Sequence, residues 1–420
     1  MNRNSVPGRR ITVLSCVLLF ALFHAITGVF LDGAGFFLSE ERFGNDLRWR
    51  RNEVCCAHQG VNSFRIWNHE RELEGFRPIW RPDKENKGRP GDRSVHAYPP
   101  WHTSLFYFYG WMPQSMCLCF MSMVFGLCLC FIVAECIRIF RLRIPDYGIP
   151  VAFCLSMIVV YAVRCFIFLN YGVLVLAAIL AMNKALERNR DVCAGMLWAV
   201  AMIKPQVGLL FFWPLFWKKR YKTICVAITA CLALTFITSV LVNESVMDLI
   251  LQVPEMAKPY SSTIVVRALK PLFGAYVSTT LRILFFLGVG IITFMVKDRM
   301  DFVLLCALVS VIVPIWTYCQ CHDYVILLFW YLLWSLMFVT NAKCKKALLF
   351  CMIGYVMGDV FTCSWCLVQG LDLFDPSDVF GRMYGIARRM MDAFCVTMMV
   401  LVVHEIKSSP LPKVSCRLKL

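Results

Sequence analysis

The stretch that decides the fold is Gln114–Ile137, QSMCLCFMSMVFGLCLCFIVAECI, which is followed by Arg138, Arg141 and Arg143. A helix needs about 20 predominantly apolar residues to cross the hydrocarbon core of a bilayer, and this stretch meets that length. Basic residues directly after a span indicate the cytoplasmic side of the membrane. We therefore predict a membrane-spanning helix that ends in the cytoplasm.

The composition of the whole chain supports a membrane protein. Of its 420 residues, 59% are hydrophobic and 17% are charged, and the mean hydropathy is +0.64. Soluble domains carry about 25% charged residues, so this composition excludes a soluble globular protein. The net charge of +16 would suggest nucleic acid as a partner of a soluble chain. In a membrane protein it is explained by cytoplasmic loops, so we predict a membrane partner and no nucleic acid.

The first span is predicted at Ile11–Leu31, directly after Arg9 and Arg10. Its apolar stretch exceeds the roughly 7–15 residues of a signal-peptide core, so we interpret it as an uncleaved helix with a cytoplasmic N-terminus. The polar residues 32–103 then form a large first extracytoplasmic loop.

Two apolar regions, Ile149–Met182 and Val192–Trp217, have basic residues at both of their ends. Cytoplasmic charge at both ends predicts that each region is a helical hairpin. The first turn is expected near Arg164–Asn170. The second is expected at Lys204-Pro205, because proline breaks a helix and disfavours helical geometry at the preceding residue. A single kinked helix is the alternative for the second region.

The same two criteria, span length and loop charge, predict the remaining spans at Thr223–Val242, Val277–Val296, Phe302–Tyr318, Tyr324–Val339, Ala347–Phe361 and Ala393–Val403. The fold class is therefore an all-α polytopic membrane protein with about 12 membrane-crossing segments. Residues 1–420 form a single membrane domain, and residues 407–420 form a basic cytoplasmic tail.

Lys204 is the most unusual residue of the predicted spans. Placing an ammonium group inside apolar sequence costs about 2.5–3.5 kcal/mol even on insertion scales. In the structural interpretation, the Lys204 ammonium reaches the lipid headgroups or pairs with a carboxylate. In the functional interpretation, it binds an anion such as a lipid phosphate. Because it lies with Pro205 and Gln206 at a helix break, we favour the functional interpretation.

His322-Asp323, just before the span at Tyr324, is the second unusual feature. Asp323 could be a helix N-cap or a functional carboxylate, and the sequence does not decide between them. Asp46 has the local chemistry of an ordinary loop carboxylate. The predicted topology nevertheless places Asp46, Lys204 and His322 on the same face of the membrane.

The histidines and cysteines indicate neither a metal site nor a cofactor. Four of the seven histidines lie in the first loop, at spacings that fit no metal motif: His58, His69, His96 and His102. Most of the 22 cysteines lie in apolar runs, where a thiol acts as a small hydrophobe. Pairing among Cys55, Cys56, Cys319 and Cys321 is left open, because sequence does not show proximity.

Four motifs occur in a fixed order along residues 40–330. They are Asp46 with Gly60-Val61-Asn62-Ser63-Phe64, then Tyr98-Pro99-Pro100, then Lys204-Pro205-Gln206, and last His322-Asp323-Tyr324. With these motifs the chain resembles the polyprenyl-phosphate-mannose-dependent mannosyltransferases of glycosyltransferase family 87, which have the GT-C fold. The family's Gly-Gln before the fourth span is replaced here by Leu169-Asn170, and its Pro and Tyr in the first motif are replaced by Ser63 and Phe64. A polar insertion at about residues 70–93 has no counterpart in the family pattern.

The resemblance implies that a sugar, mannose in the family, moves from a polyprenyl-phosphate donor to a glycan, lipid or protein acceptor at the extracytoplasmic face of the cell (inner) membrane. It implies inversion at the sugar, with Asp46 as general base. The donor would be bound by Lys204, Gln206, His322, Asp323, Arg164 and Asn170. Gly60, Asn62, Tyr98 and Pro99 would shape the substrate loop.

Two other classes of function stay open on the sequence. A transporter or flippase for lipid-linked sugars would also need intramembrane charge and many spans. A non-enzymatic assembly subunit would explain the spans, but would give Lys204-Pro205-Gln206 and His322-Asp323 no reason to share one face of the membrane.

Overall fold

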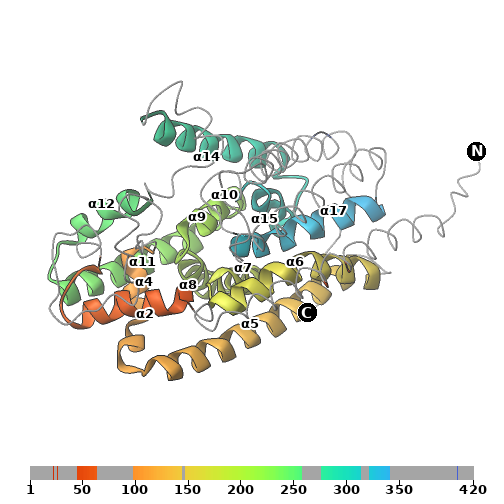
Figure 1. Ribbon diagram of the computed structural model, residues 1–420. Helices are drawn as coiled ribbons and strands as arrows, with labels where there is room; N and C mark the ends of the chain where they lie inside the picture. The colour runs from red at the N-terminus through yellow and green to blue at the C-terminus, as the bar shows by residue number, and fades with distance from the viewer. Residues whose placement is uncertain are drawn as a thin grey trace, which may run out of the picture.

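The computed structural model describes residues 45–63, 98–143, 147–257, 276–313 and 321–340, together with Leu22, Ile26 and His404. Every element in this part of the chain is a helix (Figure 1). The predicted spans at 11–31, 347–361 and 393–403 lie outside the described residues, apart from those single positions. The total of about 12 membrane crossings therefore stays a prediction.

The described helices follow one another with short connections. In chain order they are α2 (Asn45–His58), α4 (Pro100–Leu105), η2 (Tyr107–Trp111), α5 (Gln114–Arg141), α6 (Gly148–Phe168), α7 (Gly172–Glu187), α8 (Asp191–Ala201), α9 (Pro205–Gly208), η3 (Leu209–Phe211), α10 (Phe212–Trp217), α11 (Tyr221–Val242), α12 (Val246–Ala257), α14 (Tyr276–Val296), α15 (Phe302–Ser310), η4 (Cys321–Leu327) and α17 (Leu328–Thr340).

Two of these helices, α5 and α11, are long and apolar enough to cross a membrane. A third candidate is α6, which bends by 41° between its two halves. Helices α5 and α11 cover the stretches predicted to span at Gln114–Ile137 and Thr223–Val242, and α6 covers the first half of the predicted hairpin Ile149–Met182. The structure describes the predicted span at 324–339 as a 3₁₀ helix, η4, that continues into α17.

The first predicted hairpin consists of α6 and α7, with its turn at Leu169-Asn170. Leu169 has a left-handed backbone (φ 49°), and the backbone N–H of Asn170 donates to the Cys165 carbonyl at 2.9 Å. A left-handed residue followed by such a bond is a common way to end a helix, usually with glycine. Here a buried leucine adopts the same conformation.

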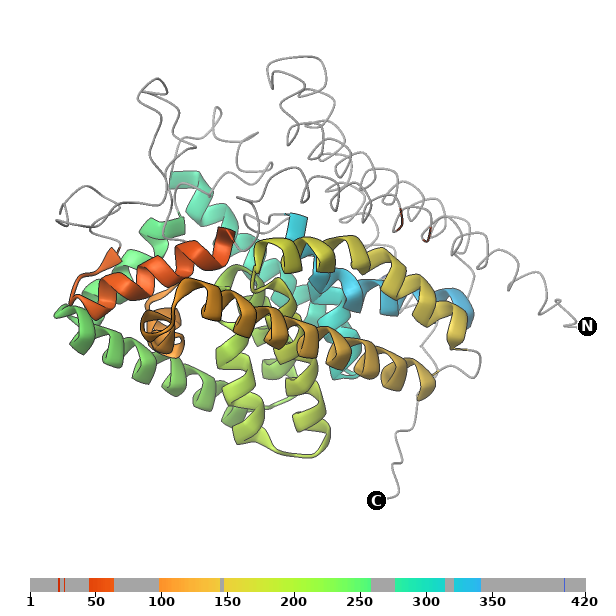
Figure 2. The same ribbon diagram turned by 60° about the horizontal axis from the view of Figure 1, so that its bottom comes forward.

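The second predicted hairpin is confirmed by contacts between its two ends. Arg220, after α10, pairs with Asp191 at the start of α8 at 3.5 Å, and Thr223 Oγ1 donates to the Asp191 carboxylate at 3.1 Å. At 1.5 Å rise per residue, a single helix through residues 191–217 would separate these ends by about 40 Å. The chain instead reverses at Lys204, between α8 and α9. Figure 2 shows the described helices of the bundle from a second direction.

The basic residues at and just after the C-terminal ends of α5, α7, α10 and α14 gather at one end of the bundle, which we call the basic end. It holds the C-terminal ends of α5, α7, α10 and α14 with the connections that follow them, and its contacts include Arg143–Asp301 (2.7 Å) and Lys218 Nζ donating to the carbonyls of Lys297 and Met300 (2.7 Å each). The hairpin turns at Asn170 and Lys204 lie at the opposite end. This arrangement agrees with the loop-charge argument that placed the basic residues on one side.

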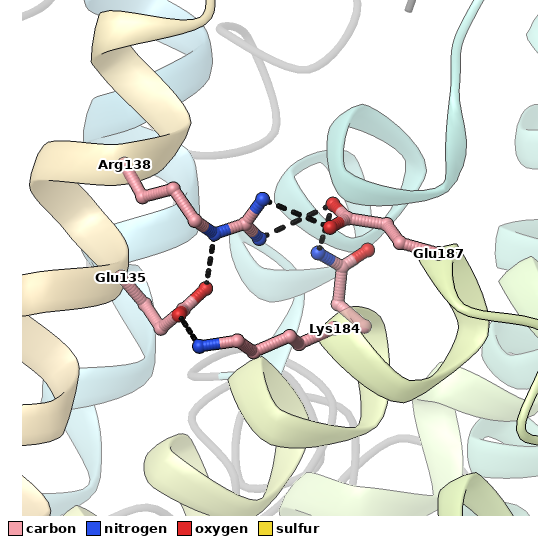
Figure 3. Close-up of polar contacts among 5 residues, drawn as sticks. Glu135, Arg138, Lys184 and Glu187 are labelled. Carbon is pink, nitrogen blue, oxygen red and sulfur yellow. Dashed lines mark hydrogen bonds and ion pairs between the residues drawn. The ribbon is translucent and has the colours of Figure 1, made fainter. Parts of the chain in front are cut away.

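A buried carboxylate, Glu135, joins α5 to α7 at the basic end (Figure 3). It accepts from Arg138 on its own helix at 2.7 Å and from Lys184 on α7 at 2.5 Å. Arg138 also pairs with Glu187 on α7 at 2.9 Å. The Glu135 side chain is 3% exposed, whereas that of Glu187 is 32% exposed.

This difference in burial gives a testable prediction. We expect Glu135→Gln to lower the free energy of unfolding by about 1–3 kcal/mol, because two cations lose a buried charged acceptor. The matched change Glu187→Gln should cost less than about 1 kcal/mol, since the exposed pair is solvated. Unfolding in detergent measures both. Equal losses of unfolding free energy for the two variants would show that the burial of Glu135 does not strengthen its ion pairs.

Close packing of α8 against α11 depends on Gly195. A Cβ atom built there would lie 2.6 Å from the Val226 Cβ and 2.7 Å from the Thr223 carbonyl oxygen. We expect Gly195→Ala to force the helices apart and to cost about 1–3 kcal/mol of unfolding free energy.

The control is Gly126 in α5, where a Cβ would meet no described atom within 4 Å. Gly126→Ala should be neutral or stabilise the helix by about 0.5–1 kcal/mol. Thermal unfolding of the two alanine variants makes the comparison. Similar midpoints would argue against the α8–α11 contact.

Two helices lie in segments that the sequence predicted only as loops. The segment predicted to be the first extracytoplasmic loop contains α2, which packs against α4, α5, α6 and α11 (Figure 1). The loop after α11 contains α12, which buries Leu249 and exposes Met247 and Leu251. The polar loop residues therefore form part of the fold and position the site described below.

Candidate functional site

Four polar side chains meet at the end of the bundle opposite the basic end. Asp46 comes from the first turn of α2, Asn170 from the turn between α6 and α7, Lys204 from the tip of the α8–α10 hairpin, and Asp323 from η4. Asn170, Lys204 and Asp323 are buried, and Asp46 is half-buried. Four separate segments of the chain thus contribute to one polar cluster.

Hydrogen bonds fix the orientation of the Asn170 amide. Its oxygen accepts from Lys204 Nζ at 2.5 Å and from the Gly172 backbone N–H at 3.0 Å. Both of these partners are donors, so the amide nitrogen must point the other way. There it donates to the Asp46 carboxylate. Asn170 therefore connects the ammonium of Lys204 to Asp46 and holds one Asp46 oxygen in place.

Lys204 forms a buried ion pair with Asp323, and the side chains are 3% and 2% exposed. The pairing with a carboxylate that the sequence left open is seen here, and the binding of an anion by Lys204 stays a prediction. The N-cap interpretation of Asp323 is wrong, because Asp323 lies within η4 and its side chain contacts Lys204. Lys204 has three N–H donors, and the described residues account for two of them.

A second group of polar residues surrounds Tyr98, just before α4. The Arg50 guanidinium lies 4.5 Å from the centre of the Tyr98 ring and pairs with Glu53 on the same helix. Burial raises the pKa of Tyr98 well above its usual value, and the nearby charge of Asp46 raises it further. Tyr98 thus stays a neutral phenol beside Asp46 and Arg50.

The sequence did not single out Arg50. The sequence feature that could have identified Arg50 is the helical spacing of Asp46, Arg50 and Glu53, which places all three on one face of α2. That spacing has meaning only if the segment is a helix, and residues 45–58 were expected to be loop. The polar sequence NDLRWRRNEVCCAH has no apolar stripe that would have predicted the helix.

The remaining residues proposed for donor binding lie near the cluster or outside the described part. Arg164 is buried in the last turns of α6, which packs against η4. Gln206 is half-buried on α9, two residues after Lys204. His322 belongs to η4, but its side chain lies outside the described residues, so its proposed contact stays a prediction.

Of the residues proposed for the substrate loop, Tyr98 lies beside the cluster and three have other contacts. Gly60 ends α2 with a left-handed backbone (φ 72°), and Pro99 precedes α4 and accepts from the His102 backbone N–H at 2.9 Å. Asn62 donates to Glu244 at 2.7 Å, so its side chain bonds to the segment after α11 and not to Asp46.

Among the described residues, no group of His, Cys, Asp and Glu is arranged to hold a metal ion. Cys55 and Cys56 both carry free thiols. Burial, reinforced by the charge of Glu53, raises the pKa of the Cys56 thiol to about 12, so this thiol is protonated and unreactive at neutral pH. Their possible partners, Cys319 and the Cys321 side chain, lie outside the described part.

Comparison with known proteins gives one match. No curated protein and no solved structure matches the chain. The family model of glycosyltransferase family 87 matches residues 96–341, which include Tyr98, Asn170, Lys204 and Asp323. Asp46 precedes the matched residues, so its link to the site depends on its contact with Asn170. Because the match covers more than half of the chain, the protein belongs to glycosyltransferase family 87 and is a membrane glycosyltransferase.

Proposed function

We propose that the protein transfers a sugar, mannose in the first instance, from a polyprenyl-phosphate donor to a glycan, lipid or protein acceptor at the extracytoplasmic face of a cell (inner) membrane. The observation that carries this proposal is the contact chain Asp46–Asn170–Lys204–Asp323. It joins a half-buried carboxylate to a buried cation at the end of the bundle opposite the basic loops.

The reaction proposed is an inverting displacement. An acceptor hydroxyl oxygen attacks the anomeric carbon of the sugar, while the bond from that carbon to the phosphate oxygen breaks. The leaving polyprenyl phosphate takes the bonding electrons, and Asp46 takes the hydroxyl proton. General-base assistance of this kind contributes about 10²–10⁴ in rate.

One observed contact and one available donor support these roles. Asn170 donates to one oxygen of Asp46, which leaves the other oxygen of that carboxylate to meet the acceptor hydroxyl. The third N–H of Lys204 would donate to a phosphate oxygen of the donor, so that the developing negative charge is stabilised in a site of low dielectric. Arg164, Gln206 and His322 are the further candidates for donor contacts.

The test uses purified protein in lipid bilayers with a panel of polyprenyl-phosphate sugars and crude membrane acceptors. We expect release of polyprenyl phosphate from one donor. A transporter or flippase would move the lipid-linked sugar across the bilayer without releasing polyprenyl phosphate. Movement without release, in protein shown to be folded, would therefore contradict the proposal and favour transport.

A further inference from the structure

Trp101, in the first turn of α4, contacts the tip of the hairpin that carries Lys204. Its indole Nε1 donates to the backbone carbonyl of Met202 at 3.0 Å. The two residues are 101 positions apart, so the bond joins distant segments of the chain. The side chain of Trp101 is half-buried, and the site described above does not use it.

The Met202 carbonyl needs a donor because the helix breaks at Lys204. In a continuous α-helix this carbonyl would accept from the backbone N–H four residues on, which belongs to Gln206. Lys204, between α8 and α9, has a non-helical backbone (φ −115°, ψ 81°). A carbonyl at such a helix end costs free energy if it is buried without a partner. Trp101 supplies the donor that the break removes.

The short helix that carries Trp101 is itself fixed on α11. Thr238 Oγ1 donates to the Pro100 carbonyl at 2.8 Å, and Ser104 Oγ donates to the Leu234 carbonyl at 2.8 Å. Thr238 and Leu234 belong to α11, which is long and apolar enough to cross a membrane. Trp101 therefore joins the hairpin tip to one of the main helices of the bundle.

A second tryptophan holds the two arms of the hairpin together. Trp198 Nε1, on α8, donates to the Gly208 carbonyl at the end of α9 at 3.0 Å. Gly208 packs closely on α8, since a Cβ there would lie 2.8 Å from the Ala201 carbonyl oxygen. Trp198 thus closes the hairpin on itself, whereas Trp101 connects the closed tip to the rest of the protein.

The next residue of α4 contacts the turn that supplies Asn170. His102 Nε2 lies 3.2 Å from the hydroxyl oxygen of Tyr171, which directly follows Asn170. Adjacent residues of α4 thus contact the two chain reversals that bring Asn170 and Lys204 together. The position of these reversals matters, because Lys204 Nζ donates both to Asn170 at 2.5 Å and to Asp323.

We propose that Trp101 is a positioning residue, which holds Lys204 where its ammonium meets the phosphate of the lipid-linked donor. The inference rests on the proposed function, because that function places the phosphate at Lys204. Trp101 acts through the Met202 carbonyl, two residues before the lysine, and not by contact with the phosphate. A misplacement of about 1 Å can cost about a hundredfold in rate, so the loss of this hydrogen bond should be measurable at the site.

Two replacements remove the indole donor and keep an aromatic ring at this position. The first is Trp101→Phe. The second replaces Trp101 by benzothienylalanine, in which sulfur takes the place of the indole N–H and the shape is nearly that of tryptophan. The control is Trp217→Phe at the basic end, because the Trp217 indole also donates between helices, to Thr293 Oγ1 at 3.0 Å. Loss of stability alone should therefore be similar for the two phenylalanine variants.

The first measurement is backbone hydrogen exchange in phospholipid nanodiscs, which needs no donor. With the Met202 carbonyl unpaired, the amides of residues 203–208 should exchange about tenfold faster in both Trp101 variants than in the wild type. The Trp217→Phe control should match the wild type at these residues. Equal protection of α5 in all the proteins shows that they are folded. Unchanged exchange at residues 203–208 in both Trp101 variants would overturn the inference.

The second measurement is the dissociation constant of polyprenyl phosphate in the same nanodiscs. Both Trp101 variants should bind about tenfold more weakly, the effect of one weakened hydrogen bond to a charged group, and Trp217→Phe should bind as the wild type does. In transfer assays the half-saturating concentration of donor should rise by the same factor, and that of acceptor should not change. A lower maximal rate with both concentrations unchanged would show a structural role only and would contradict the inference.

These outcomes separate the inference from the proposed function. If the wild type does not bind polyprenyl phosphate, the proposed role of Lys204 in donor binding fails. If the wild type and both Trp101 variants bind it equally, the inference alone is overturned. Equal weakening by Trp217→Phe would also overturn the inference, because the effect would then not come from the hairpin tip.

Discussion

Replacement of Asp46 by asparagine is expected to abolish most of the activity and to leave the fold intact. The introduced amide has nearly the same shape, and its oxygen can still accept from Asn170. It cannot take a proton from the acceptor hydroxyl, so the rate of polyprenyl phosphate release should fall by at least about a hundredfold. Binding of polyprenyl phosphate should not change, because Asp46 is not proposed to contact the phosphate.

Asp248→Asn is the matched control for this change. Asp248 is an exposed carboxylate on α12 that accepts from Ser245 at 2.7 Å. Its removal should leave the rate unchanged. If Asp46→Asn and Asp248→Asn both retained wild-type turnover, Asp46 would have no part in the mechanism.

Replacement of Lys204 by methionine is expected to cause the largest loss of stability. Methionine keeps much of the apolar stem, so the change mainly removes the charge and leaves Asp323 buried without its cation. Breaking a buried ion pair in this way costs about 3–5 kcal/mol. The measurement is the free energy of unfolding in detergent, compared with the wild type.

A second substitution separates the role of Lys204 in stability from its role in donor binding. In the double variant Lys204→Met/Asp323→Asn the stranded carboxylate is neutral, so part of the lost stability should return. Polyprenyl phosphate binding should stay weak in the double variant, because the cation is still missing. Recovery of both properties would show that Lys204 acts only as a partner for Asp323.

Much of the bundle could be predicted from the sequence, because span length and loop charge are local signals. The start of α5 at Gln114 and the two hairpins agree with the prediction. The turns at Asn170 and Lys204 also lie together, as the predicted topology required. The resemblance to glycosyltransferase family 87 is confirmed by the family match.

The side-chain partners could not be predicted, because they come from segments far apart in the chain. Asp323 is 119 residues from Lys204, and Asp46 is 124 residues from Asn170. Sequence could place these residues on one face of the membrane, but not in contact. Arg50 was missed for a different reason, since a polar helix packed in a loop shows no apolar periodicity.

The hairpin turn at Lys204 has a consequence for biosynthesis. Lys204 leaves the ribosome 119 residues before Asp323, an interval of about 6–24 s at 5–20 residues per second. The lysine is thus synthesised before its carboxylate partner exists. Asn170 has already been made by then, so the bond from Lys204 to Asn170 can form first. The ion pair with Asp323 forms later and completes the site.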